Sequence, residues 1–228
     1  MIRMMSIRSL KRRVEVWPRR QASLFSNPLA TWPERELAEG IMQDAHYLDD
    51  LRSRFNAGEE IEFVYFWGDE PGKNGVSASC LSQWYGAPFV VDGSLYPTAE
   101  HFMMAQKASL FGDHATRERV LQAATPEAAK ALGRQVQGFD ENIWLKNRFA
   151  IVVRANEAKF SQNAELRRFL VQTGSRILVE ASPVDRIWGI GLAQDDDRTN
   201  NPNLWRGLNL LGFALMQVRA TAEPCTHV

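Results

Sequence analysis

Glu100 and Lys107 form the residue pair with the clearest potential for chemistry. A carboxylate and an amine seven positions apart share one face of a helix, here with Met103 and Met104 between them. Burial can lower the pKa of a lysine by about 3 units, which turns its ammonium into a nucleophilic amine that can attack an anomeric carbon or form a Schiff base. Glu100 can then move protons. The alternative, which spacing alone favours, is an exposed pair at the edge of a core-facing stripe.

A second candidate segment, residues 182–191, carries an acid, an indole and two glycines. Asp185 precedes Trp188, whose indole can stack on a base, and Gly189 and Gly191 allow the backbone to approach a ligand closely. A structured turn around a core tryptophan explains the same pattern and, without further information, is the simpler interpretation.

The remaining candidates are single residues that can contact a substrate. Asn209 stands at an expected helix start, where its side chain can cap the backbone or bind a hydroxyl, with a plain cap as the alternative. Arg134 follows Leu132-Gly133 and can contact a phosphate. Four further side chains complete the predicted substrate-binding set, with core positions as the alternative for most of them: Trp67, Trp84, Tyr96 and His101. The four histidines lack metal-ligand spacing, so we expect no metal and no cofactor.

Local signals predict the elements that must hold these residues. A strand is expected at 61–67, a hairpin at 89–91 and 94–96 around Asp92-Gly93, and a short strand at 176–181. Helices are expected over 34–55, 98–111, 114–123, 126–132, 140–158, 163–172 and 208–219. The prediction is a single, mostly helical α+β domain with a few short strands. Its expected boundaries are an N-terminal extension at 1–60, the domain at 61–220 and a C-terminal tail at 221–228.

Composition excludes several classes of protein. The chain has 228 residues, 45% of them hydrophobic, and 27 basic against 27 acidic side chains, which are ordinary values for a globular protein. No apolar run approaches the roughly 20 residues that span a bilayer, and the N-terminus lacks a secretory apolar region, so we expect no membrane partner. Two cysteines indicate no disulfide framework, which favours a reducing, cytoplasmic setting.

The zero net charge hides a strong asymmetry. Residues 1–20 carry a net charge of +6, residues 21–60 carry −5, and the remainder carries −1. The favoured interpretation of the basic arm is a solvated segment that pairs loosely with an acidic helix, and the alternative is an arm that contacts phosphates of nucleic acid. Zero charge is therefore no argument against a nucleic-acid substrate.

Together, three segments resemble the NADAR family, also called the YbiA-like family. They are Tyr96-Pro97-Thr98-Ala99-Glu100-His101 continuing to Ala105-Gln106-Lys107; Ser182-Pro183 with Asp185 and Trp188-Gly189-Ile190-Gly191; and Gly207-Leu208-Asn209-Leu210-Leu211-Gly212 with Leu215-Met216 and Arg219. The match covers about 62–219 in order and spacing, and three motifs in order are specific where one is weak. The chain departs from the family pattern Leu-Ser-Asn-Phe, because Gln83 and Trp84 follow Leu81-Ser82.

The resemblance implies a compact, helix-rich enzyme that hydrolyses N-glycosidic bonds of ribose. Its implied substrate is ADP-ribose attached to guanine in nucleic acid, or alternatively a phosphoribosylamino-pyrimidine intermediate of riboflavin synthesis. The resemblance also implies a lysine imine, for which Lys107 is the matching position, and Glu100 or Asp185 is the expected proton donor. A gene for an ADP-ribosyltransferase is a possible genomic neighbour. A non-catalytic module that binds ADP-ribose or a nucleotide is the alternative from another class.

Overall fold

The computed structural model describes residues 46–73 and 75–222. The expectations for the basic arm, for the first part of the 34–55 helix and for most of the C-terminal tail lie outside these residues.

A two-stranded parallel sheet forms the centre of the described structure. Strand β1 (Phe63–Phe66) pairs with β4 (Ile177–Glu180), in a register that places Phe66 opposite Glu180. Both strands are built from aromatic and aliphatic residues, which favour extended backbone. Leu178 belongs to one hydrophobic cluster, and Ile177 and Val179 belong to a second. The sheet is therefore covered on both faces, as parallel strands usually are.

The predicted hairpin is confirmed. β2 (Phe89–Val91) and β3 (Ser94–Tyr96) pair antiparallel across Asp92-Gly93, and both turn residues have positive φ, at 50° and 76°. Such angles match the twist of a two-residue hairpin turn.

Helices occupy most of the segment between β1 and β4. After the short 3₁₀ helix η1 (Ala78–Leu81) and the hairpin come α2 (Ala99–Leu110), α3 (His114–Leu121), α4 (Pro126–Gly133), α5 (Glu141–Gln162) and α6 (Ala164–Gln172). Beyond β4 lie η2 (Asp197–Asn200), η3 (Pro202–Leu204) and α7 (Leu210–Thr221). Thr98, Asp113, Thr125 and Asp140 cap their helices by accepting a backbone N–H.

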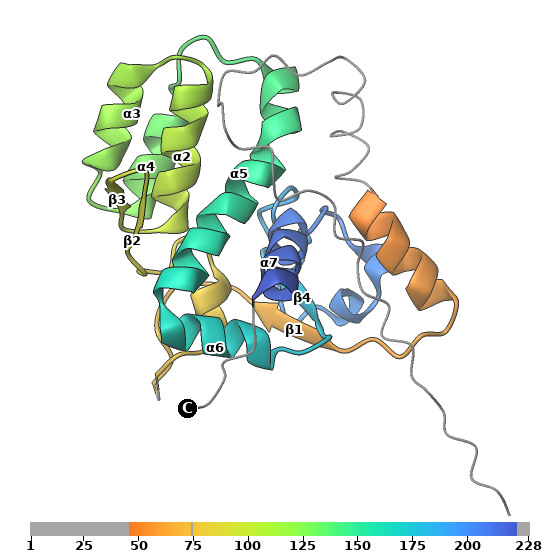
Figure 1. Cartoon of the computed structure of the whole chain (residues 1–228). Helices are drawn as coiled ribbons and strands as arrows, with labels where there is room; N and C mark the ends of the chain where they lie inside the picture. The colour runs from red at the N-terminus through yellow and green to blue at the C-terminus, as the bar shows by residue number, and fades with distance from the viewer. Residues whose placement is uncertain (1–45, 74, 223–228) are drawn as a thin grey trace, which may run out of the picture. The chain divides into compact units, whose positions relative to one another are not determined.

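Helix α5 lies between two groups of elements, as Figure 1 shows. It packs against α2 on one side and against α7 on the other, while α7 covers β4. Helices α2, α3 and α4 contact one another. The approach of α4 to α2 is close, because a Cβ atom on Gly133 would lie 2.0 Å from the sulfur of Met104. Because α4 lies this close to α2, the side chains of α4 can reach the residues in the first turn of α2.

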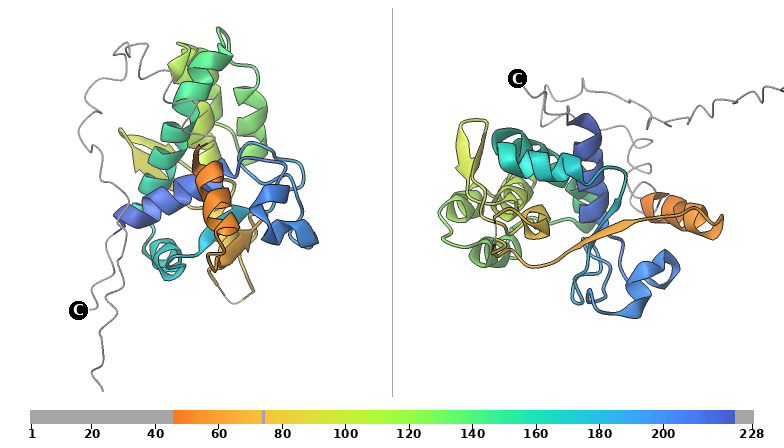
Figure 2. Two further views of the ribbon diagram at one scale, coloured as in Figure 1. Left: turned by 90° about the vertical axis from the view of Figure 1, so that its right-hand side faces the viewer. Right: turned by 90° about the horizontal axis from the view of Figure 1, so that it is seen from below.

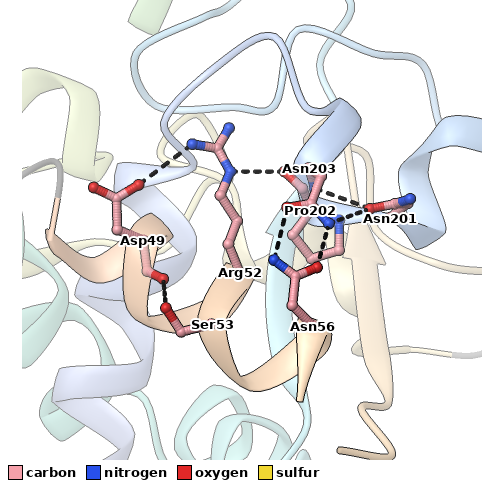
Figure 3. Close-up of polar contacts among 7 residues, drawn as sticks. All are labelled: Asp49, Arg52, Ser53, Asn56, Asn201, Pro202 and Asn203. Carbon is pink, nitrogen blue, oxygen red and sulfur yellow. Dashed lines mark hydrogen bonds and ion pairs between the residues drawn. The ribbon is translucent and has the colours of Figure 1, made fainter. Parts of the chain in front are cut away.

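A helix over residues 46–56 covers the second cluster. Leu48 and Leu51 are buried there against Ile177, Val179 and Trp205. Polar contacts fasten the same helix to the segment of η3, as Figure 3 shows: Arg52 donates to the Pro202 carbonyl at 3.2 Å, and Asn56 exchanges amide hydrogen bonds with Asn203. Seen from below in Figure 2, this helix and the hairpin lie at opposite sides of the sheet.

The predicted fold class, a mostly helical α+β domain with a few short strands, is confirmed. The described helices differ from the expected ranges by a few residues at their ends. Helix α7 begins at Leu210 because Asn209 adopts left-handed backbone, with φ of 56°. None of the described helices combines the length and apolarity that a membrane crossing requires.

The helix over 46–56 should contribute measurably to stability. Leu51→Ala removes a side chain that is 1% exposed in the second cluster, and such truncations cost about 2 to 5 kcal/mol. Urea unfolding measures the loss, and Ser53→Ala, an exposed position on the same helix, is the matched control. Equal unfolding midpoints for both variants would show that this helix is not part of the cooperative fold.

Candidate active site

The candidate site lies where β4 ends. Glu180 is the last residue of β4, and the loop that follows carries Asp185 and Trp188. Helix α2 begins beside this loop and contributes Glu100 from its first turn. Ligands commonly bind at the carboxyl edge of parallel strands, because the loops that follow the strands gather there.

Glu100 is a buried carboxyl group, only 2% exposed. Its backbone N–H donates to the Gln83 carbonyl at 3.0 Å, and the Trp84 side chain contributes a hydrogen bond to its carboxyl group. The Oε1 atom is buried and has no hydrogen-bond partner among the residues that the structure describes. Desolvation raises the pKa of Glu100 to about 7, even though Lys130, Trp84 and Arg134 act in the opposite direction.

Glu180 is a second carboxyl group in the same environment. Its Oε2 atom is shielded from solvent, and no residue in 46–73 or 75–222 forms a hydrogen bond with it. Desolvation, together with the charges of Asp185 and Glu100, raises the pKa of Glu180 to about 8. Because each carboxylate disfavours ionisation of the other, the site holds at least one proton near neutral pH.

Helix α4 brings two cations to these acids. The charge of Lys130 lowers the pKa of both Glu100 and Glu180, and the exposed Arg134 also acts on Glu100. The Nζ atom of Lys130 stands 5.6 Å from the centre of the Trp84 ring. The site therefore combines a proton-bearing carboxyl pair, an amine and a half-buried indole.

Asp185 shapes the loop that it belongs to. Its Oδ1 atom accepts the backbone N–H groups of Ile187 and Trp188, each at 2.8 Å, and its own N–H donates to Ser182. Its charge also acts on Glu100 and Glu180. Among the three acids, Asp185 is thus the one held by backbone donors, which leaves the two glutamates as the better proton donors.

Both ends of the Asn209 side-chain amide form hydrogen bonds with the backbone of β4. Its Oδ1 accepts the N–H of Glu180 at 3.0 Å, and its Nδ2 donates to the Leu178 carbonyl at 2.9 Å. With 0% exposure, Asn209 supports the backbone of β4. It thereby sets the position of Glu180.

The glycines of the loop permit a close backbone approach. A Cβ atom on Gly207 would lie 2.3 Å from the Gly189 carbonyl oxygen, and one on Gly189 would lie 2.8 Å from the Glu180 carbonyl. The segment before α7 can therefore lie directly against the loop, where the N–H of Leu211 donates to Trp188 O at 3.1 Å. These contacts hold Trp188 and Asp185 beside Glu180.

Lys107 lies away from this group of residues. It stands in the last turn of α2, about 10 Å along the helix from Glu100 at 1.5 Å per residue. Its Nζ is 4.2 Å from the centre of the Phe139 ring and 5.4 Å from that of Trp144. Desolvation lowers its pKa, as the sequence argument requires, but the carboxyl pair is at the other end of the helix. The catalytic role of Lys107 stays a prediction.

The other predicted contacts divide between the core and the surface. Tyr96 is 1% exposed and packs on Phe89 and Phe102. His101 is also buried, with one ring nitrogen 2.8 Å from Thr98 Oγ1 and the other 3.1 Å from the Ala123 carbonyl. Trp67 directly follows β1 and is 61% exposed.

Sequence reasoning missed Glu180, Lys130 and Lys159. Lys159 on α5 is 0% exposed, and its Nζ donates to the carbonyls of Cys80 and Ser82 at 2.7 and 2.8 Å. Desolvation lowers its pKa to about 7. This amine anchors the segment that leads directly into Gln83 and Trp84, so it positions the wall of the site. Glu180 could have been predicted from the sequence, because a charged residue at the end of an otherwise apolar strand is unusual.

Metal binding finds no support among the residues that the structure describes. No three side chains of His, Cys, Asp or Glu there are arranged to share a metal ion.

The comparisons define the class of protein. The model of the NADAR domain matches residues 65–222. N-glycosidase R617 of Acanthamoeba polyphaga mimivirus is 40% identical over 166 residues, which cover 71% of this chain and 96% of the relative. N-glycosidase YbiA of Escherichia coli is 34% identical over 139 residues, 61% of this chain and 78% of the relative. The NMR structure of Escherichia coli YbiA superposes with a TM-score of 0.55 at 28% identity, covering 74% of this chain and 93% of that one.

The chain belongs to the NADAR family. The matched region contains every residue of the candidate site, from Trp84 to Asn209.

Neutralising the buried acid should stabilise the protein at high pH. The folded-state pKa of Glu100, about 7, exceeds its ordinary value of 4.5, so the folded protein binds more protons than the unfolded chain between these values. The free energy of unfolding therefore falls as pH rises through this window. Glu100→Gln should be more stable than wild type by about 3 kcal/mol at pH 8, with a much smaller difference at pH 5.

Urea denaturation at several pH values measures this difference. Glu165→Gln, an exposed position on α6, is the control and should follow the wild type at every pH. Parallel stability curves for Glu100→Gln and wild type would show that Glu100 ionises normally.

Proposed function

We propose that this protein is an N-glycosidase that hydrolyses the bond between C1 of a ribose and a base nitrogen. The observation that carries the proposal is the carboxyl pair Glu100 and Glu180, with pKa values of about 7 and 8 at one site. A leaving nitrogen must gain a proton as the glycosidic bond breaks, and an acid with a pKa near the working pH donates it best. Relatives named N-glycosidases at 33–40% identity support the same reaction.

We further propose ADP-ribose linked to guanine in nucleic acid as the substrate. The planar Trp84 and Trp188 suit a base, and the unpartnered oxygens of Glu100 and Glu180 suit hydroxyl or amine donors such as those of ribose. A phosphoribosylamino-pyrimidine offers the same bond to the same groups. Incubating the protein separately with ADP-ribosylated DNA and with the pyrimidine intermediate distinguishes the two substrates. Binding of ADP-ribose without release of any base would instead favour a non-catalytic module.

The reaction balances with water as the co-reactant. Glu100 or Glu180 gives its proton to the leaving nitrogen, or to the ring oxygen to open the ribose, and the C1–nitrogen bond breaks. In the lysine route an amine displaces the base at C1 and loses a proton to a carboxylate, and the ring oxygen then takes up a proton as the C1–oxygen bond breaks to leave an imine. Water then adds to C1, the amine leaves, and the carboxyl group regains a proton. The products are the free base and the ribosyl group with a hydroxyl on C1.

Among the described residues, Lys130 is the lysine whose charge acts on both acids, whereas the family resemblance assigns the imine to Lys107. We therefore propose Lys130 as the nucleophile, supported by its charge effect on both glutamates and its place beside Trp84. Neighbouring carboxylates can accept the proton that the amine must lose before it attacks.

Loss of the acid should abolish turnover. Glu100→Gln should lower kcat at least about 100-fold, because positioned proton transfer contributes that much or more. The wild-type rate should fall as pH rises through 7 to 8, where the proton leaves the pair. Base release followed by chromatography measures both effects, with Glu165→Gln as the control. A rate that is flat to pH 9 would contradict the proposed proton donor.

Borohydride trapping identifies the amine. Reduction during turnover should join the ribosyl group covalently to wild type and to Lys107→Ala, but not to Lys130→Ala. Peptide mass spectrometry then locates the adduct. Trapping that survives Lys130→Ala and disappears in Lys107→Ala would restore the assignment from sequence. Full turnover without either amine would eliminate the covalent route.

A further inference from the structure

Two arginine side chains, Arg186 and Arg206, approach Gly191 in the loop that carries Asp185 and Trp188. A Cβ atom placed on Gly191 would lie 3.0 Å from Cβ of Arg206 and 3.1 Å from Cγ of Arg186. The first side-chain atoms of the two arginines therefore lie on either side of Gly191, within reach of one small ligand. Gly191 itself has φ of 68°, so the turn that brings them together depends on a glycine.

Backbone hydrogen bonds hold both arginines in place. The N–H of Arg206 donates to Ile190 O at 2.9 Å, the N–H of Leu208 donates to Arg186 O at 3.0 Å, and Gly191 N donates to Asp185 O at 3.0 Å. A Cβ atom on Gly207 would lie 2.7 Å from Cα of Arg186, which shows how closely the two segments meet. The pair is therefore built into the loop that forms the site.

The guanidinium groups themselves are open to solvent. Both arginines are exposed, and within 46–73 and 75–222 neither side chain has a hydrogen bond or an ion pair. Arg206 acts electrostatically on Asp196, but both carboxylate oxygens of Asp196 are bonded to Arg198. Two exposed cations on adjacent segments can share one anion, because its oxygens can accept hydrogen bonds from both guanidinium groups.

We propose that Arg186 and Arg206 bind the phosphate or diphosphate ester carried by the same ribose whose C1 reacts at Glu100 and Glu180. The assignment rests on the proposed function. Arg186 directly follows Asp185, whose charge acts on both glutamates, while the cations that act on Glu100 are Lys130 and Arg134. The proposal places the group on C5 of the bound ribose at the arginine pair, of which Arg186 stands one residue beyond Asp185 on the same loop. A guanidinium group can donate two parallel hydrogen bonds to two oxygens of one phosphate.

The surroundings favour a small phosphate ester over a nucleic-acid backbone. Asp195 and Asp197 are exposed on the segment between the two arginines and would repel a long polyanion. A single phosphate or diphosphate carries fewer negative charges past these acids than a nucleic-acid backbone does.

Binding of reaction products tests the site without turnover. ADP-ribose, ribose 5-phosphate, ribose and an unmodified oligonucleotide are each titrated into the full chain and followed by NMR. Arg186→Gln and Arg206→Gln should each lower the affinity for ADP-ribose and for ribose 5-phosphate at least about tenfold, because each variant loses a charge-assisted hydrogen bond. Affinity for ribose should not change. Arg186→Lys should retain part of the affinity, and Arg168→Gln, exposed on α6, should retain all of it.

Three results would overturn the proposal. They are wild-type affinity for ADP-ribose in both Gln variants, an equal loss of affinity for ribose, and a loss confined to an unmodified oligonucleotide. The last result would assign the arginines to a nucleic-acid backbone. Because no bond is cleaved, failure here leaves the N-glycosidase proposal intact. Conversely, an absence of turnover in the catalytic assays leaves this binding result standing.

Discussion

Two carboxyl groups taken out of water at one place cannot both be charged without a large cost in free energy, and this constraint governs the site. Glu100 and Glu180 are desolvated together, with a third acid, Asp185, beside them. Lys130 and Arg134 offset part of the negative charge, yet the pKa values remain raised. The protein therefore keeps a proton next to a half-buried indole and an amine, the arrangement that we propose for cleavage of an N-glycosidic bond.

Contacts between distant segments of the chain hold the two acids together at this place. Pairing of β1 with β4 ends at Glu180, and Asn209 fixes the β4 backbone from the start of α7. Helix α2 brings Glu100 to the same edge. Lys159 then holds the segment before Trp84 from the inside of the molecule. Each of these contacts joins segments distant in sequence, so the acids stay desolvated only while the whole arrangement is intact.

Local signals in the sequence were sufficient to predict most of the helices and strands. Asp92-Gly93 predicted the hairpin, and Thr125-Pro126 predicted the start of α4. The site was predictable only in part: Glu100, Asp185, Trp84 and Trp188 were recognised, but Glu180 and Lys130 were not. Their roles depend on a parallel pairing across more than 100 residues and on the contact of Gly133 with Met104, which no local pattern encodes. The Arg186 and Arg206 pair likewise follows from one tight turn at Gly191.

The central claim is that one of these two glutamates is protonated at neutral pH, and a direct titration tests it. NMR of protein labelled with ¹³C at the glutamate carboxyl carbons, with Glu100→Gln to assign the signals, follows each group separately. The account predicts titration of Glu100 and Glu180 between about pH 7 and 8. Titration of both near their ordinary value of 4.5 would contradict it.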